Sequence, residues 1–231
     1  MTVARLPSAV LFDWDGTLID SWGAIHAALV GTQRAFGVEP WNLVETRARL
    51  QSLRDHFPVA FGERWREALA DYRTRYYANH LEAIAMLDGA EALLDAFAAL
   101  GVPLAVVSNK LGDGLRAEAA HVGWSARFAC LIGSGDAARD KPDPAPAFAA
   151  LDALGMAASE AVWLVGDSTV DLACAERAGL MPVLVGDDPA AHAAAHAVAG
   201  PVVPRLADCH ALRDYVAALK GGVEQSARIP I

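Results

Sequence analysis

The stretch FDWDGTLIDS, residues 12–21, follows the apolar residues 9–11 and places two aspartates, Asp13 and Asp15, at the end of an expected buried strand. Two carboxylates at such a position are destabilising unless a ligand or an opposite charge compensates them. A strand alone would point them to opposite sides, but Gly16 permits a turn that brings both into one crevice. The alternative is a pair of turn-forming aspartates in a surface loop, because Asp-Gly is a frequent turn dipeptide.

Short apolar runs without polar alternation recur along the chain, and each ends in a loop signal. Runs of this kind indicate strands that are buried on both faces. The expected strands are 9–13, 103–108, 129–133, 161–166 and 182–185, with a candidate sixth at 201–203. Alanine-rich helical stretches lie between them, at about 89–100, 112–122, 144–154, 169–178 and 208–219. This alternation predicts a Rossmann-like, doubly wound parallel α/β sheet with helices on both faces.

The region between residues 21 and 86 breaks this rhythm, because it contains no buried-strand run. Its segments 22–36 and 63–78 have helical periodicity and many charges, and the region is too long for a loop. We expect an α-helical cap inserted after the first strand and packed as a separate lid. The expected limits are 1–18 and 87–231 for the α/β core and 19–86 for the cap.

The composition of the 231-residue chain favours a globular protein, with 54% hydrophobic and 20% charged residues. Its 19 Lys+Arg and 28 Asp+Glu give a formal net charge of −9, which disfavours binding to nucleic acid or to an anionic membrane. The three cysteines form no CxxC pair, and the sequence shows neither a signal peptide nor a run of membrane-spanning length. We expect a cytoplasmic protein, monomer or homodimer, that can still take a small anionic substrate.

A second acidic pair follows the fourth expected strand, in the sequence VGDSTVD at 165–171. Asp167 stands at the strand end, and Asp171 lies about one helical turn further on. Ser168 or Thr169 could simply cap the next helix, with Asp171 near its positive end. Those structural roles leave Asp167 free to bind a ligand. Carboxylates that converge from separate strand ends would repel without a hard cation, and oxygen ligands suit Mg²⁺.

Groups that can donate to an oxyanion follow two other strands. Ser108, Asn109 and Lys110 end the second strand, and Lys141 follows the third, before a proline. The chain has only three lysines, so the position of two of them after strand ends is informative. A compact ammonium suits a point charge beside a phosphoryl group and a carboxylate. Lys110 could equally be a solvated residue at a helix start.

In this order and at these strand ends, the four segments resemble the four signature motifs of the haloacid dehalogenase-like (HAD) hydrolase superfamily. The helical-cap branch of phosphoglycolate phosphatase and β-phosphoglucomutase is the most similar, and the resemblance covers the whole chain. It implies that Asp13 is a nucleophile that becomes an aspartyl phosphate. It implies that Asp15 is the general acid and then the base, that Ser108 and Asn109 bind phosphoryl oxygens, and that Lys141 steadies the nucleophile.

The resemblance also implies a Mg²⁺ cofactor. The ion would be held by the Asp13 carboxylate, the Asp15 backbone carbonyl and Asp167, with Asp171 supporting these ligands. A carboxylate that attacks a phosphate dianion meets like charge, so a metal and a lysine are needed to bring them together. Haloacid dehalogenases lack the second aspartate and use no Mg²⁺, so Asp15 and Asp167 place the chain with the phosphotransfer members.

The expected cap has a cluster of positive groups, from which Arg49, Arg54 and His56 are candidates to bind a second anionic group of the substrate. The alternative is a solvated charged helix. Relatives of the phosphoglycolate phosphatase type often have a Gly-x-Pro-like element near this place, and residues 51–53 (QSL) do not match it. No lysine occurs in 19–86, which excludes the Schiff-base chemistry of phosphonoacetaldehyde hydrolases.

Two other patterns are weak. Residues 133–138 fit a loose GxGxxA dinucleotide fingerprint, but no apolar helix follows them. His192 and His196 have the spacing of a zinc site without its glutamate, and we expect an exposed helix face there.

The sequence therefore predicts a Mg²⁺-dependent phosphoric monoester hydrolase that acts on a small phosphorylated metabolite. Two alternatives remain open at this point. One is a sugar phosphomutase that uses the same aspartyl phosphate, and the other is a non-catalytic binding protein with the same fold.

Overall fold

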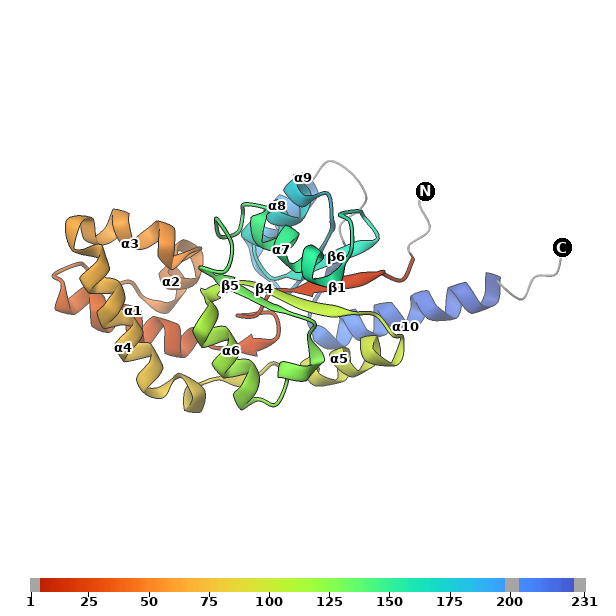
Figure 1. Ribbon diagram of the computed structural model, residues 1–231, viewed down its shortest axis with the longest axis horizontal. Coiled ribbons are helices and arrows are strands. Elements are labelled where there is room, and N and C mark those ends of the chain that lie inside the picture. Colours follow the sequence, from red (N-terminus) through yellow and green to blue (C-terminus); the bar gives the residue numbers. More distant parts are fainter. Residues whose placement is uncertain (1–4, 198–203, 227–231) are drawn as a thin grey trace.

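The computed structural model of the chain describes residues 5–197 and 204–226, and a six-stranded parallel sheet forms its centre (Figure 1). The strand order is β5-β4-β1-β6-β7-β8. The strands are β1 (Ala9–Phe12), β4 (Leu104–Leu111), β5 (Leu131–Ser134), β6 (Val162–Gly166), β7 (Met181–Val185) and β8 (Arg205–Leu206). This arrangement confirms the predicted doubly wound α/β sheet. The candidate strand at 201–203 lies outside the described residues.

Helices cover both faces of the sheet because successive residues of the buried strands point to opposite sides. Val10 and Phe12 of β1 pack in one apolar cluster with α5 and α10, whereas Ala9 and Leu11 pack in another with α7 and α8. The core helices are α5 (Ala90–Ala99), α6 (Gly112–His121), α7 (Ala145–Leu154), α8 (Thr169–Ala178), α9 (Pro189–Ala197) and α10 (Cys209–Ser226), with a short 3-10 turn η2 (Ser125–Arg127).

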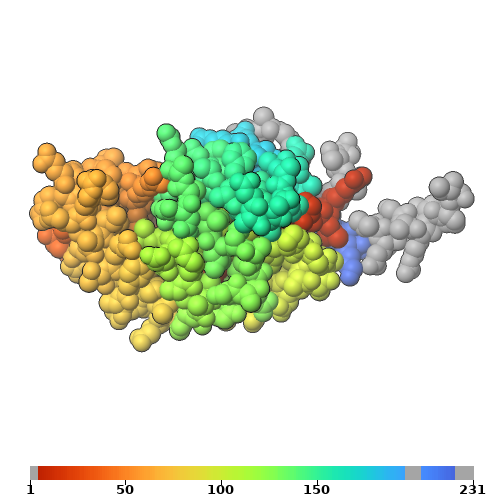
Figure 2. All heavy atoms as spheres, in the orientation of Figure 1, coloured from red at the N-terminus to blue at the C-terminus, as the bar shows by residue number. Residues whose placement is uncertain are grey.

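Four further helices, which we call the cap, lie at one end of the sheet (Figure 1). They are α1 (Trp22–Ala35), α2 (Leu43–Arg49), α3 (Leu53–Phe61) and α4 (Trp65–Ala83), with a 3-10 turn η1 (Gly62–Arg64) before α4. A two-stranded antiparallel ribbon, formed by β2 (Ile19–Asp20) and β3 (Ala85–Met86), connects the cap to the core at both ends of the cap segment. The cap has its own apolar cluster, in which Leu29, Phe57 and Tyr72 are buried. In Figure 2 its surface lies directly against the core.

The carboxyl ends of β1, β4 and β6 are adjacent, since β4 and β6 both pair with β1. Residues that follow these three strands therefore meet at one edge of the sheet, on the side of the cap. Gly16 turns the chain after β1 with φ +85°, and a Cβ there would lie 2.3 Å from the Asp167 carboxylate. Among the described helices, none combines the length and the apolar character needed to cross a membrane.

Gly133 in β5 allows the backbone of that strand to approach the start of α6. A Cβ at this position would lie 2.5 Å from Gly112 Cα and 2.8 Å from the Lys110 carbonyl oxygen. We predict that Gly133→Ala lowers the free energy of unfolding by about 1–3 kcal/mol, because these backbone atoms cannot move independently. Urea denaturation measures the change.

The matched control is Gly23→Ala in α1, where an added Cβ would meet nothing within 4 Å. Its stability should stay within about 1 kcal/mol of the wild type, because alanine is the better helix former. Equal stabilities of the two variants would contradict the close approach at Gly133.

Candidate active site

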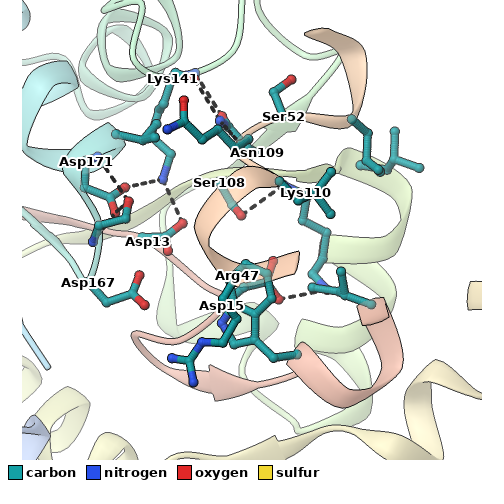
Figure 3. A pocket seen from close by; sticks show the side chains of 18 of the residues that line it. Asp13, Asp15, Arg47, Ser52, Ser108, Asn109, Lys110, Lys141, Asp167 and Asp171 are labelled. Atoms are coloured by element: carbon teal, nitrogen blue, oxygen red, sulfur yellow. Dashed lines mark hydrogen bonds and ion pairs between the residues drawn. The ribbon is translucent and has the colours of Figure 1, made fainter. Parts of the chain in front are cut away.

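One pocket lies between the cap and the carboxyl edge of the sheet (Figure 3). Every core residue that the sequence analysis selected lines it: Asp13, Asp15, Ser108, Asn109, Lys141, Asp167 and Asp171. The cap contributes Trp22, Arg47, Gln51, Ser52, Tyr72, Tyr76 and Tyr77.

Lys141 connects two of the carboxylates. Its Nζ lies 2.7 Å from Asp13 Oδ1 and 2.6 Å from Asp171 Oδ1, and the residue is only 2% exposed. Burial raises the pKa of Asp13 to about 7, although the Lys141 charge acts to lower it. Burial would lower the pKa of Lys141, but the two carboxylates raise it above its ordinary value. Lys141 therefore stays charged and fixes one oxygen of Asp13.

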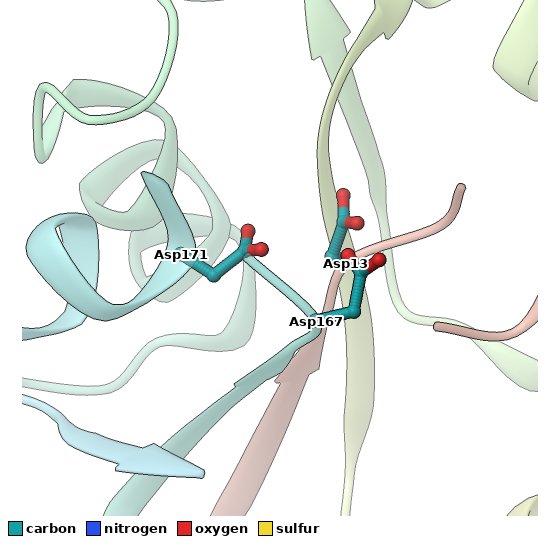
Figure 4. Close-up of side chains that lie close together, drawn as sticks. All are labelled: Asp13, Asp167 and Asp171. Atoms are coloured by element: carbon teal, nitrogen blue, oxygen red, sulfur yellow. The ribbon is translucent and has the colours of Figure 1, made fainter. Parts of the chain in front are cut away.

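Asp13, Asp167 and Asp171 form a cluster whose ligand atoms lie within 4.8 Å of one another (Figure 4). Both oxygens of Asp171 are engaged, Oδ1 by Lys141 and Oδ2 by the backbone N–H of Ser168 at 3.1 Å. Asp167 accepts no hydrogen bond from the described part of the chain, and burial together with its acidic neighbours raises its pKa well above the ordinary value. This donor set fits a hard divalent cation, which Asp13 and Asp167 would hold.

Asp15 is held by a buried cation on the other side of the pocket. Lys110 Nζ lies 2.9 Å from Asp15 Oδ1 and 2.9 Å from Glu118 Oε1, and Ser21 donates a hydrogen bond to Asp15. The cap residue Tyr76 completes this group, since its hydroxyl bonds both Lys110 and Glu118. Burial alone would lower the pKa of Lys110, but its two carboxylate partners raise it.

A solvated Lys110 is therefore excluded, because its side chain is only 4% exposed. The expected strand end at 108 is three residues short, since β4 continues to Leu111 and carries Lys110 into the interior. The rarity of lysine in this chain was the signal that could have identified the residue.

Ser108 and Asn109 differ in what they can offer a phosphate. The Asn109 amide bonds the backbone N–H and carbonyl of Lys141, each at 2.8 Å, and also the Gln51 carbonyl at 2.8 Å. Its side chain thus joins the Lys141 loop to the cap. Ser108 is buried beside the pocket, and its hydroxyl oxygen accepts from the Lys110 N–H at 3.2 Å, which leaves its own proton available.

The structure brings none of the three cap candidates to the pocket lining. Arg49 pairs with Glu45 at 3.2 Å, and Arg54 donates to the Ala137 carbonyl oxygen at 3.4 Å. His56 packs on the Trp41 ring, 4.6 Å between centroids. They contact the cap surface or the rim of the core instead.

Arg47, which the sequence analysis did not select, lines the pocket in their place. Residues 47 and 49 lie two positions apart on α2, about 200° around the helix, so they point to opposite faces. Charge alone did not indicate which face was turned toward the core.

The cap is also bonded to the Lys141 loop. Ser52 donates to Asp140 Oδ2 at 2.6 Å, and Ser134 donates to the same oxygen at 2.9 Å. Asp140 is buried, so this contact with Ser52 closes the cap directly beside Lys141.

The two weak sequence patterns have structural explanations. Gly133 donates its N–H to the Asp136 carboxylate at 2.8 Å within a turn, and no helix begins there to bind a dinucleotide. His192 is half-buried rather than exposed, with its Nε2 2.8 Å from the Gly186 carbonyl oxygen. The side chain of His196 lies outside the described residues.

The sequence model of the haloacid dehalogenase-like hydrolase family matches residues 10–185. A phosphoglycolate phosphatase of Rhodospirillum rubrum is 34% identical over 193 residues, which are 78% of this chain and 79% of that protein. A phosphoglycolate phosphatase of Xanthomonas campestris is 33% identical over 195 residues, which are 80% of this chain and 88% of that protein.

Solved structures have the same fold. A HAD-superfamily hydrolase from Ehrlichia chaffeensis is 28% identical, with a TM-score of 0.64 over 94% of this chain and 99% of that one. A haloacid dehalogenase-like family hydrolase from Streptococcus pneumoniae is 22% identical, with a TM-score of 0.76 over 93% of this chain and 100% of that one. These matches confirm the resemblance inferred from the four motifs. The chain belongs to the haloacid dehalogenase-like hydrolase family, and within it to the phosphatases, which are phosphoric monoester hydrolases.

Proposed function

We propose that the protein is a Mg²⁺-dependent phosphatase that hydrolyses phosphoglycolate, or a small ester very similar to it, through an aspartyl phosphate on Asp13. The observation that carries this proposal is the position of the Asp13 carboxylate, buried in the pocket between the Lys141 ammonium and the carboxylate of Asp167. The phosphoglycolate phosphatases among the relatives support the substrate. Three cysteines without a disulfide support a reducing, cytoplasmic compartment.

In the first step a carboxylate oxygen of Asp13 attacks the phosphorus, and the bond to the ester oxygen breaks. Lys141 holds Asp13 Oδ1, which leaves Oδ2, 3.5 Å from the Thr17 hydroxyl, for the attack. Ser108 donates a hydrogen bond from its hydroxyl to a phosphoryl oxygen. Asp15 gives its proton to the departing ester oxygen, which leaves as an alcohol.

In the second step water attacks the phosphorus of the aspartyl phosphate, and the bond to Asp13 breaks. Asp15 now takes the proton of the water, and Lys110 and Ser21 keep its carboxylate in place for both transfers. Inorganic phosphate leaves and Asp13 is regenerated.

Asp13 and Asp167, with the backbone carbonyl of Asp15, would hold the Mg²⁺ ion. When bound, the ion supplies positive charge that reduces the repulsion between the phosphate dianion and the Asp13 carboxylate.

We predict that Asp13→Asn lowers kcat for phosphoglycolate by about 10³-fold or more, because an amide cannot form the acyl phosphate. Release of inorganic phosphate is the measurement, and it also distinguishes a phosphatase from a phosphomutase, which returns the phosphoryl group to its substrate. A variant that keeps a tenth of the wild-type activity with an unchanged melting temperature would exclude Asp13 as the nucleophile.

We predict that excess EDTA abolishes phosphate release and that added Mg²⁺ restores it. Asp167→Asn should raise the Mg²⁺ concentration for half-maximal activity by about 10–100-fold, because it removes a charged ligand. The control is Asp152→Asn on α7, an exposed position that loses the same charge away from the pocket. Full activity in EDTA would refute the metal requirement.

We predict that Lys110→Met lowers the free energy of unfolding by about 3–5 kcal/mol, because it leaves Glu118 and Asp15 without their buried cation. Combining it with Glu118→Gln should recover much of that stability, since one unpaired charge is removed. If Lys110 positions Asp15, kcat of the double variant stays about 10²-fold below wild type. Recovery of kcat together with stability would assign Lys110 a purely structural role.

A further inference from the structure

Arg47 is the one arginine of the described cap helices that lines the pocket. It makes no hydrogen bond or ion pair with any described residue, although its charge acts on the nearby Asp167. Figure 3 shows its guanidinium on the Asp167 side of the pocket. Five other cap arginines are paired with carboxylates: Arg49, Arg54, Arg64, Arg73 and Arg75. The free guanidinium in the pocket is therefore available to a ligand.

Trp22 supplies a second unused donor at the same place. The Arg47 guanidinium carbon lies 5.6 Å from the centroid of the Trp22 ring. The Trp22 Nε1–H is buried without a partner in the described structure, and a Cβ added to Gly16 would lie 3.0 Å from this nitrogen. Buried N–H groups in native proteins almost always have an acceptor. An acceptor from a bound molecule, next to the loop that carries Asp15, would satisfy this donor.

We propose that Arg47 and Trp22 Nε1 form a subsite for a second anionic group on the phosphate ester, a carboxylate on the carbon next to the ester oxygen. This inference rests on the proposed function and adds the residues that select its substrate class, phosphorylated short hydroxy acids. The planar guanidinium matches a carboxylate with two parallel hydrogen bonds, and the indole N–H donates a third. Because Asp15 and Asp167 would repel a second anion, this cation determines whether one can bind.

Two esters of equal chain length test the subsite. Phosphoglycolate carries the carboxylate, whereas ethyl phosphate has a methyl group in its place. We expect Arg47→Ala to lower kcat/KM for phosphoglycolate by about 100-fold, mainly through KM, and to change ethyl phosphate turnover by less than about threefold. Trp22→Phe keeps an aromatic ring and loses the N–H donor. It should lower kcat/KM about tenfold for phosphoglycolate and leave kcat/KM for ethyl phosphate unchanged. Arg47→Lys should restore part of the activity.

Arg66→Ala is the matched control. The Arg66 guanidinium also stacks on a tryptophan, 4.4 Å from the Trp65 centroid, but the residue does not line the pocket. This variant should leave kcat/KM for both esters unchanged. If Arg47→Ala lowered kcat/KM equally for both esters, the proposal would be overturned, because Arg47 would then act on the phosphoryl group or on Asp167. The proposal would also be overturned if Arg47→Ala left kcat/KM unchanged for both esters.

A binding measurement distinguishes failure of the subsite from failure of the proposed function. Phosphoglycolate is titrated by calorimetry into Asp13→Asn and into the same variant with Arg47→Ala. If the wild type hydrolyses neither ester but Arg47 still strengthens binding about 100-fold, the phosphatase proposal fails and the subsite stands. If the affinities are equal, the subsite is overturned whatever the enzyme hydrolyses.

Discussion

Compensation of buried negative charge is the constraint on which this site depends. Five carboxylates meet where the strands end, from Asp13, Asp15, Glu118, Asp167 and Asp171, and the described core supplies two buried cations against them, Lys110 and Lys141. A phosphate dianion entering such a pocket would be repelled. Positive charge must therefore arrive with a metal ion or from the cap. The Asp167 carboxylate and the Arg47 guanidinium, which have no hydrogen-bond partner in the described structure, both line this pocket.

The two lysines hold different carboxylates on two sides of the pocket. Lys141 fixes Asp13 and Asp171 on the side of β6, where the proposed nucleophile and the carboxylates proposed to bind the cation lie. Lys110 fixes Asp15 on the side of α6, where proton transfer would occur. Because Asp13 and Asp15 each have their own cation, the proposed nucleophile and the proposed acid–base group are held separately although they are two residues apart in the chain. Gly16 turns the backbone directly after Asp15, and its lack of a side chain leaves room for the Asp167 carboxylate.

The core residues that line the pocket could be grouped from the sequence because parallel strands leave little freedom. Residues at or just after the expected carboxyl ends of neighbouring parallel strands meet at one edge, so Asp13, Ser108 and Asp167 could be grouped from their positions alone. The cap follows no such rule. Several charged positions are spread around its helices, and only tertiary packing decides that Arg47 faces the pocket while Arg49 pairs with Glu45. The β2–β3 ribbon also went unpredicted, because strands of two residues have no measurable periodicity.

In this structure, contacts that hold the cap against the core also hold the side chains proposed for catalysis. Tyr76 from α4 bonds Lys110, the cation that holds Asp15, and Ser52 bonds Asp140, the neighbour of Lys141. Lys110 is thus connected to the cap through Tyr76, and the Lys141 loop through Ser52 and through the Asn109–Gln51 hydrogen bond, and an open cap would lose these contacts. A substrate that bridges the Asp13 side and Arg47 would add a further connection, so binding of the correct ester would favour the arrangement in which both lysines are fixed. Substrate selection by the cap and ordering of the core then have one physical cause.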